Sequence, residues 1–480
     1  MTQVSQPLAA PRGDLGAATV GVERVPPGFR VLGFFDHFVL WADLGVGLLV
    51  LLAGTALVPG LGLWQAFAAI LIGTLIGSVM LGLAGVVGSD HGIPSMVSLR
   101  PSFGQRGSYL PSLMNVVQLV GWGAFEIVVM AQATSRLTGP VLGMATNSVW
   151  SITWGIVVVL FALGGPLVVV RQWLEKAGIW LVLLTVSWMA VYALSHADFG
   201  ALAGRPGTGS LGFAQAIDLV VAMPISWLPL VADFNRFAKN SRSSFAGTVA
   251  GFAVSNVLCY SLGILLILVL PAGDLVGSIG AVAFGGAGLA LLLGDETDNA
   301  FADVYSSAIS IKNVIPGLPT RALVAAVGGT CLAIALTVDL ASFQGFLYLV
   351  GSLFTPLFGV LFADYFLLRR RRYTDEELYP TRPLAGLPWG VNPIALVAWA
   401  AGVAAYLGET TYVGWLGATL PSLAASLAVY LILSVAMGAL HRPRVASPPA
   451  EGPAWTDGGQ LGPTKSIAVD KPIDRPALPH

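Results

Sequence analysis

A run of acidic and amide side chains interrupts a long apolar stretch in the second half of the sequence. It reads Asp295-Glu296-Thr297-Asp298-Asn299, and apolar segments flank it at residues 281–294 and 304–311. One interpretation is a loop followed by a helix that begins at Ala300. A helix from there to Ile311, rising roughly 1.5 Å per residue, could not cross a membrane core of about 30 Å. We therefore predict one continuous helix that carries the run near its middle and faces an aqueous cavity.

The helical spacing of this region sorts its polar residues onto two faces. Asn299, Asp303 and Ser306 recur at intervals of three and four residues, so they share one face. A second face carries a different set: Gly294, Thr297 and Asp298. One face could bind a substrate and the other a cation. Hydroxyl and carboxylate oxygens are hard ligands that suit sodium, and a carboxylate could equally carry a proton.

A tryptophan and a glutamate lie one helical turn apart in an earlier apolar stretch. Trp122 and Glu126 are four residues apart and therefore share a helix face. Gly121 and Gly123 would let a ligand or another backbone approach closely. An ionisable residue inside a membrane costs at least roughly 2.5 kcal/mol unless it finds a partner or water. Glu126 either pairs with a neighbouring helix for structure alone or serves a functional site.

Two further apolar stretches contain residues that disrupt a helix. The first, Phe34–Gly47, holds two acids, a histidine and two glycines. The second, Met223–Pro229, holds two prolines, each of which removes a backbone hydrogen-bond donor. Either feature alone could be a kink or a helix boundary. Because the two stretches occupy corresponding positions in two halves of the chain, we predict that both helices are interrupted, as in transporters built from inverted repeats.

An interrupted helix frees backbone groups that can bind a ligand. Irregular backbone is tolerated at membrane depth only where it lines a cavity or is buried in protein. Freed carbonyl groups could hold a cation, and Asp43 in the first interrupted stretch is a candidate for cation coupling. For Asp233 we expect a gating or packing role, and for His37 a hydrogen bond at a helix interface.

The composition indicates that the protein surface faces lipid. Hydrophobic residues make up 55% of the 480 residues and charged residues only 10%, whereas a soluble protein needs roughly a quarter. A net charge of -1 gives no bulk field that would attract nucleic acid. The chain lacks a His-Glu-x-x-His zinc motif, a Gly-x-Ser-x-Gly elbow and a phosphate-binding loop. A membrane-embedded enzyme is therefore disfavoured, and we expect no bound cofactor.

Apolar stretches of the required length predict an all-α membrane protein with twelve transmembrane helices. The first six spans are expected at Phe34–Leu57, Leu63–Val87, Leu110–Leu137, Val149–Val169, Gly178–Leu194 and Phe213–Asp233. The second six are expected at Phe245–Leu270, Phe284–Ile311, Ala322–Val338, Phe343–Leu368, Pro393–Ala405 and Tyr412–Met437. The eleventh is the shortest.

The basic residues predict which side of the membrane each loop faces. With twelve spans and both termini in the cytosol, 22 of the 24 Lys and Arg residues fall on the cytosolic side. The two exceptions are Arg136 and Arg205. This asymmetry is what the positive-inside rule requires, and a miscounted span would scramble it. We therefore expect a multi-pass protein of the cell membrane with cytosolic termini.

The sequence divides into a central membrane domain and two polar tails. Residues 1–30 lack the apolar core of a cleaved signal peptide, and we expect a disordered cytosolic tail. The twelve-helix domain is expected at residues 31–440, with one repeat at about 31–197, the second at about 210–370 and extra helices at about 390–438. Residues 441–480 are expected to form a disordered cytosolic tail. Cys259 and Cys331 stand in apolar runs and are expected to be buried thiols.

Three segments resemble the signature of the nucleobase:cation symporter-1 family. The most specific is Leu99–Pro111 together with Gly121-Trp122. The other two are Ala232-Asp233-Phe234-Asn235-Arg236-Phe237 and Ala363-Asp364-Tyr365-Phe366-Leu367-Leu368-Arg369-Arg370. The resemblance extends from about Pro26 to Met437. It implies two inverted five-helix repeats, interrupted in helices one and six, plus two extra helices. Members import cytosine, purines, uracil, allantoin, hydantoins or vitamin precursors with sodium or protons.

The resemblance also implies a binding site. The substrate ring stacks between two tryptophans, which match Trp122 and Trp227, and Ser226 adjoins the second. Amides of the family that bind the ring's edge match Glu126 and Asp303, and both are departures; Asn299 remains an amide on the same face as Asp303. The family's sodium site maps onto five positions: Ala42, Gly45, Gly294, Thr297 and Asp298.

The two acids bear on the expected substrate. A carboxylate accepts hydrogen bonds but does not donate unless it is protonated, whereas an amide does both. Two acceptors suit a ring rich in N–H donors, such as cytosine, a purine or an aminopyrimidine like hydroxymethylpyrimidine, better than uracil or hydantoin. A protonated acid would instead be the coupling site.

Two alternatives remain beside a nucleobase symporter. The same architecture could carry an amino acid or an amine, or the protein could be an uncoupled channel or receptor. The oligomeric state is not specified by any of these residues.

Overall fold

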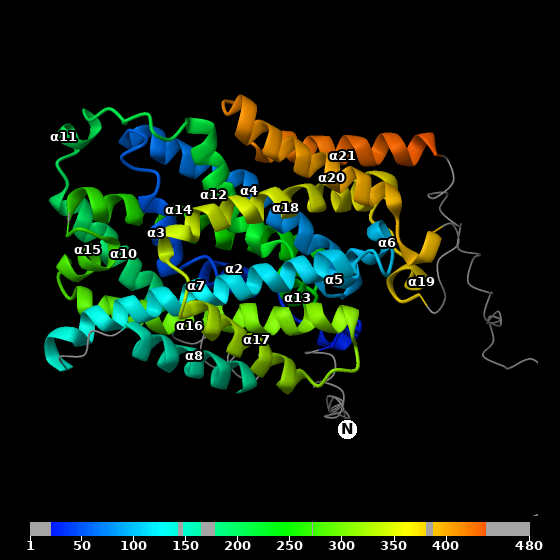
Figure 1. The fold of residues 1–480 in the computed structure, drawn as a ribbon, viewed down its shortest axis with the longest axis horizontal. Coiled ribbons are helices and arrows are strands. Elements are labelled where there is room, and N and C mark those ends of the chain that lie inside the picture. The colour runs from blue at the N-terminus through cyan, green and yellow to red at the C-terminus, as the bar shows by residue number, and fades with distance from the viewer. Residues whose placement is uncertain (1–20, 143–146, 165–177, 271, 381–386, 438–480) are drawn as a thin grey trace, which may run out of the picture. The chain divides into compact units, whose positions relative to one another are not determined.

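A computed structural model describes residues 21–142, 147–164, 178–270, 272–380 and 387–437. Within these ranges the regular elements are helices, and one isolated bridge pairs Leu32 with Ala238. Element labels are those of Figure 1, which shows the long helices running in roughly the same direction. The first half of the chain forms α2 Phe34–Asp43, α3 Leu48–Thr55, α4 Leu63–His91, α5 Ser95–Ser98, α6 Arg100–Phe103, α7 Tyr109–Leu142, α8 Asn147–Gly164, α10 Ile179–His196 and α11 Phe199–Ala203.

The second half of the chain begins with an interrupted helix, whose two parts are α12 and α13. Its elements are α12 Phe213–Trp227, α13 Val231–Asn235, α14 Ser241–Val269, α15 Leu275–Ala281, α16 Gly285–Val314, α17 Thr320–Ala335, α18 Phe343–Phe362, α19 Asp375–Leu378, α20 Pro393–Gly408 and α21 Thr419–Ala436. Short π-helical turns, η4 Ala363–Leu368 and η6 Glu409–Val413, extend α18 and α20.

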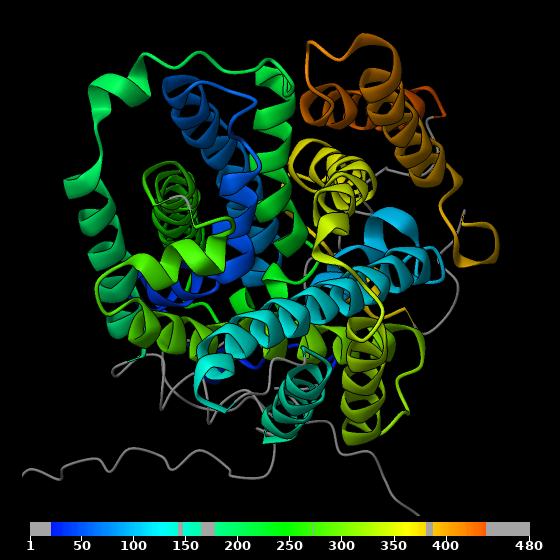
Figure 2. The ribbon, with the colours of Figure 1, turned by 60° about the vertical axis from the view of Figure 1, so that its left-hand side comes forward.

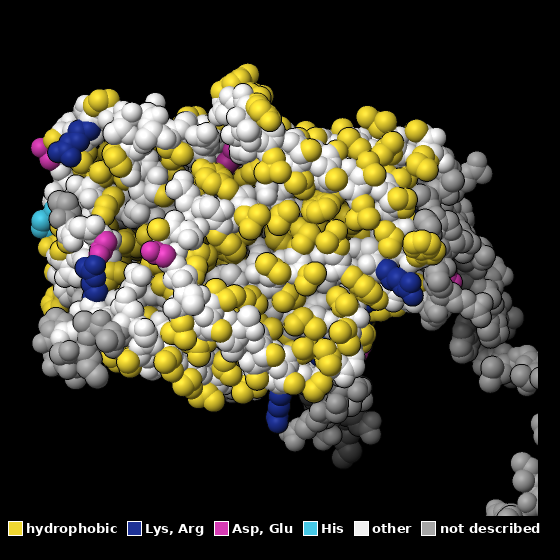
Figure 3. Space-filling view, in the orientation of Figure 1, with side chains coloured by type: hydrophobic (Ala, Val, Ile, Leu, Met, Phe, Trp, Pro, Cys, Tyr) yellow, Lys and Arg dark blue, Asp and Glu magenta, His cyan; other side chains and the backbone are white. Residues whose placement is uncertain are grey.

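The described helices are those of a multi-pass membrane protein. Seven are long and apolar enough to cross a membrane, and the bent pair α2–α3 makes an eighth. Three shorter apolar helices accompany them: α8, α12 and α17. The predicted polar helix is also continuous, since α16 runs for 30 residues. Figure 3 shows a broad hydrophobic face whose few charged side chains lie mostly toward its ends.

The helices pack in two groups around the middle of the protein. In one group, α14 lies against α2, α3 and α4, and α4 also contacts α12. In the other, α7 contacts α16, α8 and α17. Helix α18 adjoins α12 on one side and the pair α20–α21 on the other, and Figures 1 and 2 show that pair at the edge of the bundle.

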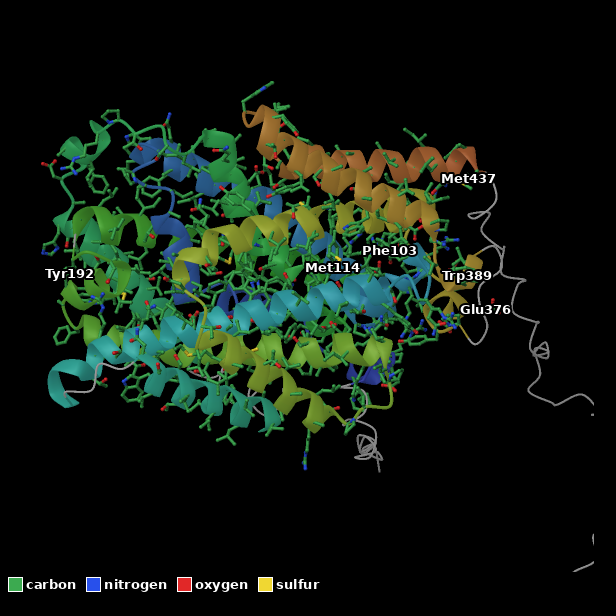
Figure 4. All side chains as sticks on the ribbon, in the orientation of Figure 1. Phe103, Met114, Tyr192, Glu376, Trp389 and Met437 are labelled. Carbon is green, nitrogen blue, oxygen red and sulfur yellow. The ribbon has the colours of Figure 1, made fainter. Side chains whose placement is uncertain are left out.

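The loops collect at the two ends of these helices. Figure 4 shows Tyr192 at one end, and Phe103, Glu376 and Trp389 at the opposite end. Tyr192 belongs to α10, whereas Phe103 ends α6, Glu376 lies in α19 and Trp389 lies in the short turn Pro388–Gly390. These short elements belong to the connections that follow α4 and α18.

The segment before the first span is ordered where the structure describes it. Residues 21–30, which the sequence suggests as part of a disordered tail, include the turn Pro27–Phe29. Val25 is buried, and its N–H donates to the carbonyl of Gly92 at 2.8 Å. The expectation of disorder is therefore wrong for these ten residues, because backbone hydrogen bonds and burial fix them against the end of α4. Residues 1–20 and 438–480 lie outside the described residues.

The predicted start of the twelfth span also differs from the structure. Tyr412, expected to start the twelfth span, belongs to the turn η6 that prolongs α20, and α21 starts at Thr419. Gly414 and Gly417 separate the two helices with φ of 72° and 77°, a left-handed conformation that ends a helix. The end of the predicted fourth span, residues 165–169, lies outside the described residues.

Candidate functional site

The first span is broken, as predicted. Helix α2 ends at Asp43, α3 begins at Leu48, and the two are bent by 63°. Glycine is required here for packing: a Cβ on Gly45 would lie 2.1 Å from Ser255 Oγ, and one on Gly47 would lie 3.1 Å from Glu296 Oε2. The break therefore brings the backbone of the first span against α14 and α16.

Two side chains of α16 bind the backbone that this break exposes. Glu296 Oε2 accepts the N–H of Leu48 at 2.7 Å, and Asn299 Nδ2 donates to the carbonyl of Val46 at 2.9 Å. Both side chains are buried. Glu296 thus caps the N-terminus of α3, where the helix dipole favours a negative charge.

The sixth span is also interrupted, next to the second of its two prolines. Pro224 lies inside α12, whereas Pro229 lies in the turn that separates Trp227 from Val231. The freed carbonyl of Ser226 accepts the side-chain N–H of Gln118 at 2.8 Å. The Ser226 hydroxyl donates to the carbonyl of Met223 at 2.6 Å. A neutral amide from α7 therefore satisfies this second break.

A small cavity lies between the two breaks. Its lining comes from α3, α7, α12, α16 and the first break, and consists of Leu44, Gly47, Leu49, Val50, Trp122, Glu126, Met223, Ser226, Trp227, Glu296 and Asn299. Two aromatic rings, two carboxylic acids, an amide and a hydroxyl therefore border one small space.

Two polar atoms of the lining have no hydrogen-bond partner within the protein. They are Trp122 Nε1 and Glu126 Oε2, both buried. A buried polar group without a partner costs about 1–3 kcal/mol. The lining thus holds one donor and one acceptor that no protein group satisfies, as a ligand site requires.

Other aromatic residues hold the two lining tryptophans. Trp122 packs edge-on against Phe343 and Phe346, with ring centroids 5.5 and 5.4 Å away. Trp227 packs edge-on against Trp41 at 5.9 Å. The indole N–H of Trp41 donates to Asn235 Oδ1 at 2.8 Å, so Trp41 is itself fixed.

Five of the six expected substrate residues line this cavity: Trp122, Glu126, Ser226, Trp227 and Asn299. The sixth, Asp303, does not belong to the lining. Its carboxyl group lies within hydrogen-bonding reach of Glu126, and its Oδ2 has no partner. Asp303 therefore contacts a lining residue without bordering the cavity itself.

The expected cation residues lie on α2, in the first break and on the first half of α16. Asp43 is buried with its Oδ1 unpartnered, and it lies close enough to Asp298 for the two charges to interact. The Thr297 hydroxyl donates to the carbonyl of Leu293 at 3.0 Å, and the space around Gly294 is open. Ala42 is fully buried. Its backbone nitrogen lies so close to Gly251 of α14 that a Cβ on that glycine would be only 2.9 Å away. Among the described residues, no group of three or more His, Cys, Asp or Glu side chains could hold a metal ion.

Sequence reasoning missed two residues of this site. Glu296 precedes Asn299 by three residues and Asp303 by seven, so its helical spacing indicated the same face. Gln118 precedes Trp122 by four residues on α7, and it too shares a face with the site. The role of each depends on a contact with a distant backbone segment, which spacing alone does not reveal.

Most motif residues that carry the family resemblance lie away from the cavity, in a polar network at one end of the helices. Arg100 donates to Asn313 Oδ1 and to the carbonyl of Leu378, both at 2.9 Å. Asp364 accepts hydrogen bonds from three hydroxyl groups, those of Ser102, Tyr373 and Tyr430, at 2.9–3.0 Å. These contacts join the loop after α4 to the ends of α16 and α18 and to the interior of α21.

Burial and charge shift the pKa values of two arginines at this end. Burial lowers the pKa of Arg100 below its usual value. Burial alone would also lower the pKa of Arg369, but the carboxylates of Asp364 and Glu377 raise it.

Asp233 accepts the N–H of Ser95 at 2.9 Å, and Ser95 Oγ accepts the N–H of Ala232 at the same distance. Asp233 therefore binds the loop after α4, which fits a packing or gating role.

Comparison with known proteins relates this geometry to a family. Residues 24–430 match the family described as permeases for cytosine/purines, uracil, thiamine and allantoin. Cytosine permease of Escherichia coli (strain K12) is 29% identical over 357 residues, which cover 73% of this chain and 80% of the relative. Hydantoin permease of Microbacterium maritypicum is 24% identical over 416 residues, covering 78% and 81% of the two chains.

A solved structure shares the fold. Mhp1, a nucleobase-cation-symport-1 family transporter in a closed conformation with bromovinylhydantoin bound, superposes with a TM-score of 0.76. Its sequence is 21% identical, and the likeness covers 88% of this chain and 97% of that one. At this identity the likeness extends to the arrangement of the helices.

Proposed function

The chain belongs to the family of permeases for cytosine, purines, uracil, thiamine and allantoin, and we propose that it imports a nucleobase or a related nitrogenous ring by symport with a cation. A permease is a transporter, so the chain is not an enzyme. The proposed substrates are cytosine, a purine or an aminopyrimidine such as hydroxymethylpyrimidine. The proposed cation is sodium or a proton.

One observation carries this proposal: two tryptophans and two acids border a small cavity between two broken helices. We infer that the ring stacks on Trp122 and Trp227, since bases stack on aromatic side chains with about 1–3 kcal/mol per base. Glu126 would accept hydrogen bonds from the ring's N–H groups, and Ser226 and Asn299 would border it. Asp303 would act through Glu126, whose carboxyl group it faces.

The cation is proposed to bind where the first break meets α16. Candidate contributors are Ala42, Asp43, Gly45, Gly294, Thr297 and Asp298. Support comes from the freed backbone of the break, the open space around Gly294 and the unpartnered Asp43 Oδ1. Coupling requires only that cation and substrate each favour the binding of the other.

We further propose twelve spans arranged as two inverted repeats of five, plus two. The eight candidate spans, the three shorter apolar helices and α16 together supply that number. The grouping of α2, α3 and α4 with α12 and α14, and of α7 and α8 with α16 and α17, supports the repeat, since the two groups contain corresponding helices of each half. The proposed domain limits are 31–197, 210–370 and 390–438, with cytosolic tails at both ends in the cell membrane.

An uptake experiment tests the proposal. Labelled cytosine, adenine and hydroxymethylpyrimidine would be offered to vesicles that contain the protein, with sodium or proton gradients imposed separately. We expect accumulation against the substrate gradient, abolished by an ionophore. Equilibration without accumulation would indicate an uncoupled channel, and competition by amino acids alone would indicate a different cargo.

The site itself is tested by binding. Trp122→Ala and Trp227→Ala should each weaken binding by about 1–3 kcal/mol, the value of base stacking on an aromatic ring. Ligand-induced quenching of tryptophan fluorescence measures this, with Trp389→Ala as the matched control, because Trp389 is 86% exposed and remote from the cavity. Normal binding by both cavity variants would show that the substrate binds elsewhere.

A further inference from the structure

A second carboxylic acid of the cavity remains available to a ligand. Glu296 borders the cavity although only 1% of its surface is exposed. Its carboxylate receives the N–H of Leu48 at 2.7 Å, and the N–H of Leu49 is a second backbone donor. A carboxylate offers about four lone-pair sites. Those not directed at the start of α3 can accept hydrogen bonds from a molecule in the cavity.

The electrostatic balance of the cavity indicates the kind of molecule that would occupy it. None of its eleven lining residues is Lys, Arg or His. Glu126 and Glu296 lie close enough for their charges to interact. Backbone N–H groups offset part of the charge of Glu296, but Glu126 Oε2 has no partner. A ligand that donates hydrogen bonds to both acids would supply what the protein lacks.

We propose that Glu296 binds the substrate directly and that the substrate is a planar ring with N–H donors on two edges, one for Glu126 and one for Glu296. This inference rests on the proposed function, since it assumes that a ring occupies the cavity. It narrows the substrate class to rings that carry an amino or amidine group on one edge and a second N–H donor on another.

The same carboxylate would link the ligand to the bend of the first span. Glu296 can reach both because residue 47 has no side chain: a Cβ there would lie 3.1 Å from Glu296 Oε2 and 3.2 Å from Asn299 Nδ2. The Glu296 carboxylate would thus lie between the backbone of the break and the ligand and contact both. A ring that binds Glu296 would stabilise the arrangement of α3 against α16.

The test combines changes in the protein with changes in the ligand. Pyrimidine, 4-aminopyrimidine and 2,4-diaminopyrimidine carry no, one and two amino groups, and a pH above the range in which these rings protonate keeps all three neutral. Their binding to the full-length protein, to Glu126→Gln and to Glu296→Gln would be measured by quenching of tryptophan fluorescence. Glutamine keeps an oxygen that can cap α3 but removes the charge, and thermal unfolding would verify that each variant is folded.

The expected result is selective. 2,4-Diaminopyrimidine should lose about tenfold in affinity in each variant, 4-aminopyrimidine in only one of them, and pyrimidine in neither. Equal losses for all three rings in Glu296→Gln, or no loss for any, would overturn the inference and leave Glu296 as a helix cap.

The ligand series also tests the inference without any variant. In the unmodified protein each amino group removed should weaken binding about tenfold, so equal affinities for the three rings would contradict direct contact with two acids. If none of the rings, nor cytosine or adenine, quenched the fluorescence, the proposed function itself would fail. If only the inference about Glu296 were wrong, the rings would still bind but without any preference for amino groups.

Discussion

The two broken spans meet the same cavity, but different chemistry holds each of them. At the first break a carboxylate and an amide of α16 bind one N–H and one carbonyl of the backbone. At the second break a neutral amide of α7 binds one carbonyl, and Trp227 packs on Trp41. The first break is therefore held by a charge that a cation or a donor-rich ligand can influence. The second is held by neutral groups, which such ligands perturb less.

This difference suggests separate roles for the breaks. A buried charge responds strongly to a neighbouring ion because the local dielectric is low. The first break is thus suited to sense the coupling cation and the polar edge of the substrate. The second break presents an aromatic surface of fixed position, which is suited to stacking.

The largest expected effect concerns the packing of the first break. Gly45→Val would drive a side chain into Ser255 Oγ, which lies 2.1 Å from the Cβ position. Overpacking of this kind costs roughly 1–3 kcal/mol or more, and we expect little folded protein after purification. Gly329→Val is the matched control, since nothing lies within 4 Å of its Cβ position in α17. Equal yields of the two variants would mean that the first break tolerates a wider separation from α14.

The next effect concerns the charge at the first break. Glu296→Ala removes the acceptor for Leu48 N–H and should lower the stability of the ligand-free protein by about 1.5–3 kcal/mol, the value of a hydrogen bond to a charged group. The midpoint of thermal unfolding measures this loss. A midpoint equal to that of the unmodified protein would indicate that water replaces the carboxylate at the start of α3.

A smaller effect is expected from the corresponding change at the second break. Gln118→Leu removes, at nearly constant volume, the hydrogen bonds that Nε2 donates to the Ser226 carbonyl and to Asn115 Oδ1. The loss should be about 1 kcal/mol for each of these neutral hydrogen bonds. If it exceeded the loss in Glu296→Ala, the proposed difference between a charged and a neutral break would be reversed.

The smallest effect is expected from removing the Ser226 hydroxyl. This change tests whether the side chain or the backbone of Ser226 holds the second break. The Ser226 hydroxyl donates to Met223 within its own helix, whereas its carbonyl binds Gln118. Ser226→Ala should therefore change the stability of the ligand-free protein by no more than about 0.5 kcal/mol. A loss as large as that of Gln118→Leu would assign the hydroxyl a structural role that its hydrogen bond does not indicate.

The sequence predicts the positions of both breaks because their causes are local. Glycines at 45 and 47 and a proline at 229 act on their own segments of backbone. The pairing of Trp122 with Glu126 follows from helical spacing in the same way. Local patterns also predict that α16 is continuous despite its acids, since the apolar segments before and after the acids are each too short to span a membrane.

The features that the sequence does not predict depend on contacts between segments that are distant in the chain. Four acids stand between residues 295 and 303, and only packing determines that Glu296 borders the cavity while Asp303 contacts Glu126 without bordering it. The order of residues 21–30 depends likewise on Gly92, which follows α2, α3 and α4 in the chain. Trp41, which supports Trp227, is in turn held by distant residues, Asn235 through a hydrogen bond and Phe252 through ring packing. Sequence periodicity indicates a face of one helix but not what that face meets.

The link between α16 and the first span uses only main-chain atoms of the first span: the carbonyl of Val46 and the N–H of Leu48. Every amino acid other than proline supplies these atoms, so exchanging the side chains at positions 46 and 48 leaves the attachment points in place. Because Val46 and Leu48 are fully buried, mutational scanning of this segment would record tolerance at both positions to apolar side chains of similar volume. A functionally essential contact would escape detection there, and only changes in α16 or the insertion of proline at position 48 would expose it.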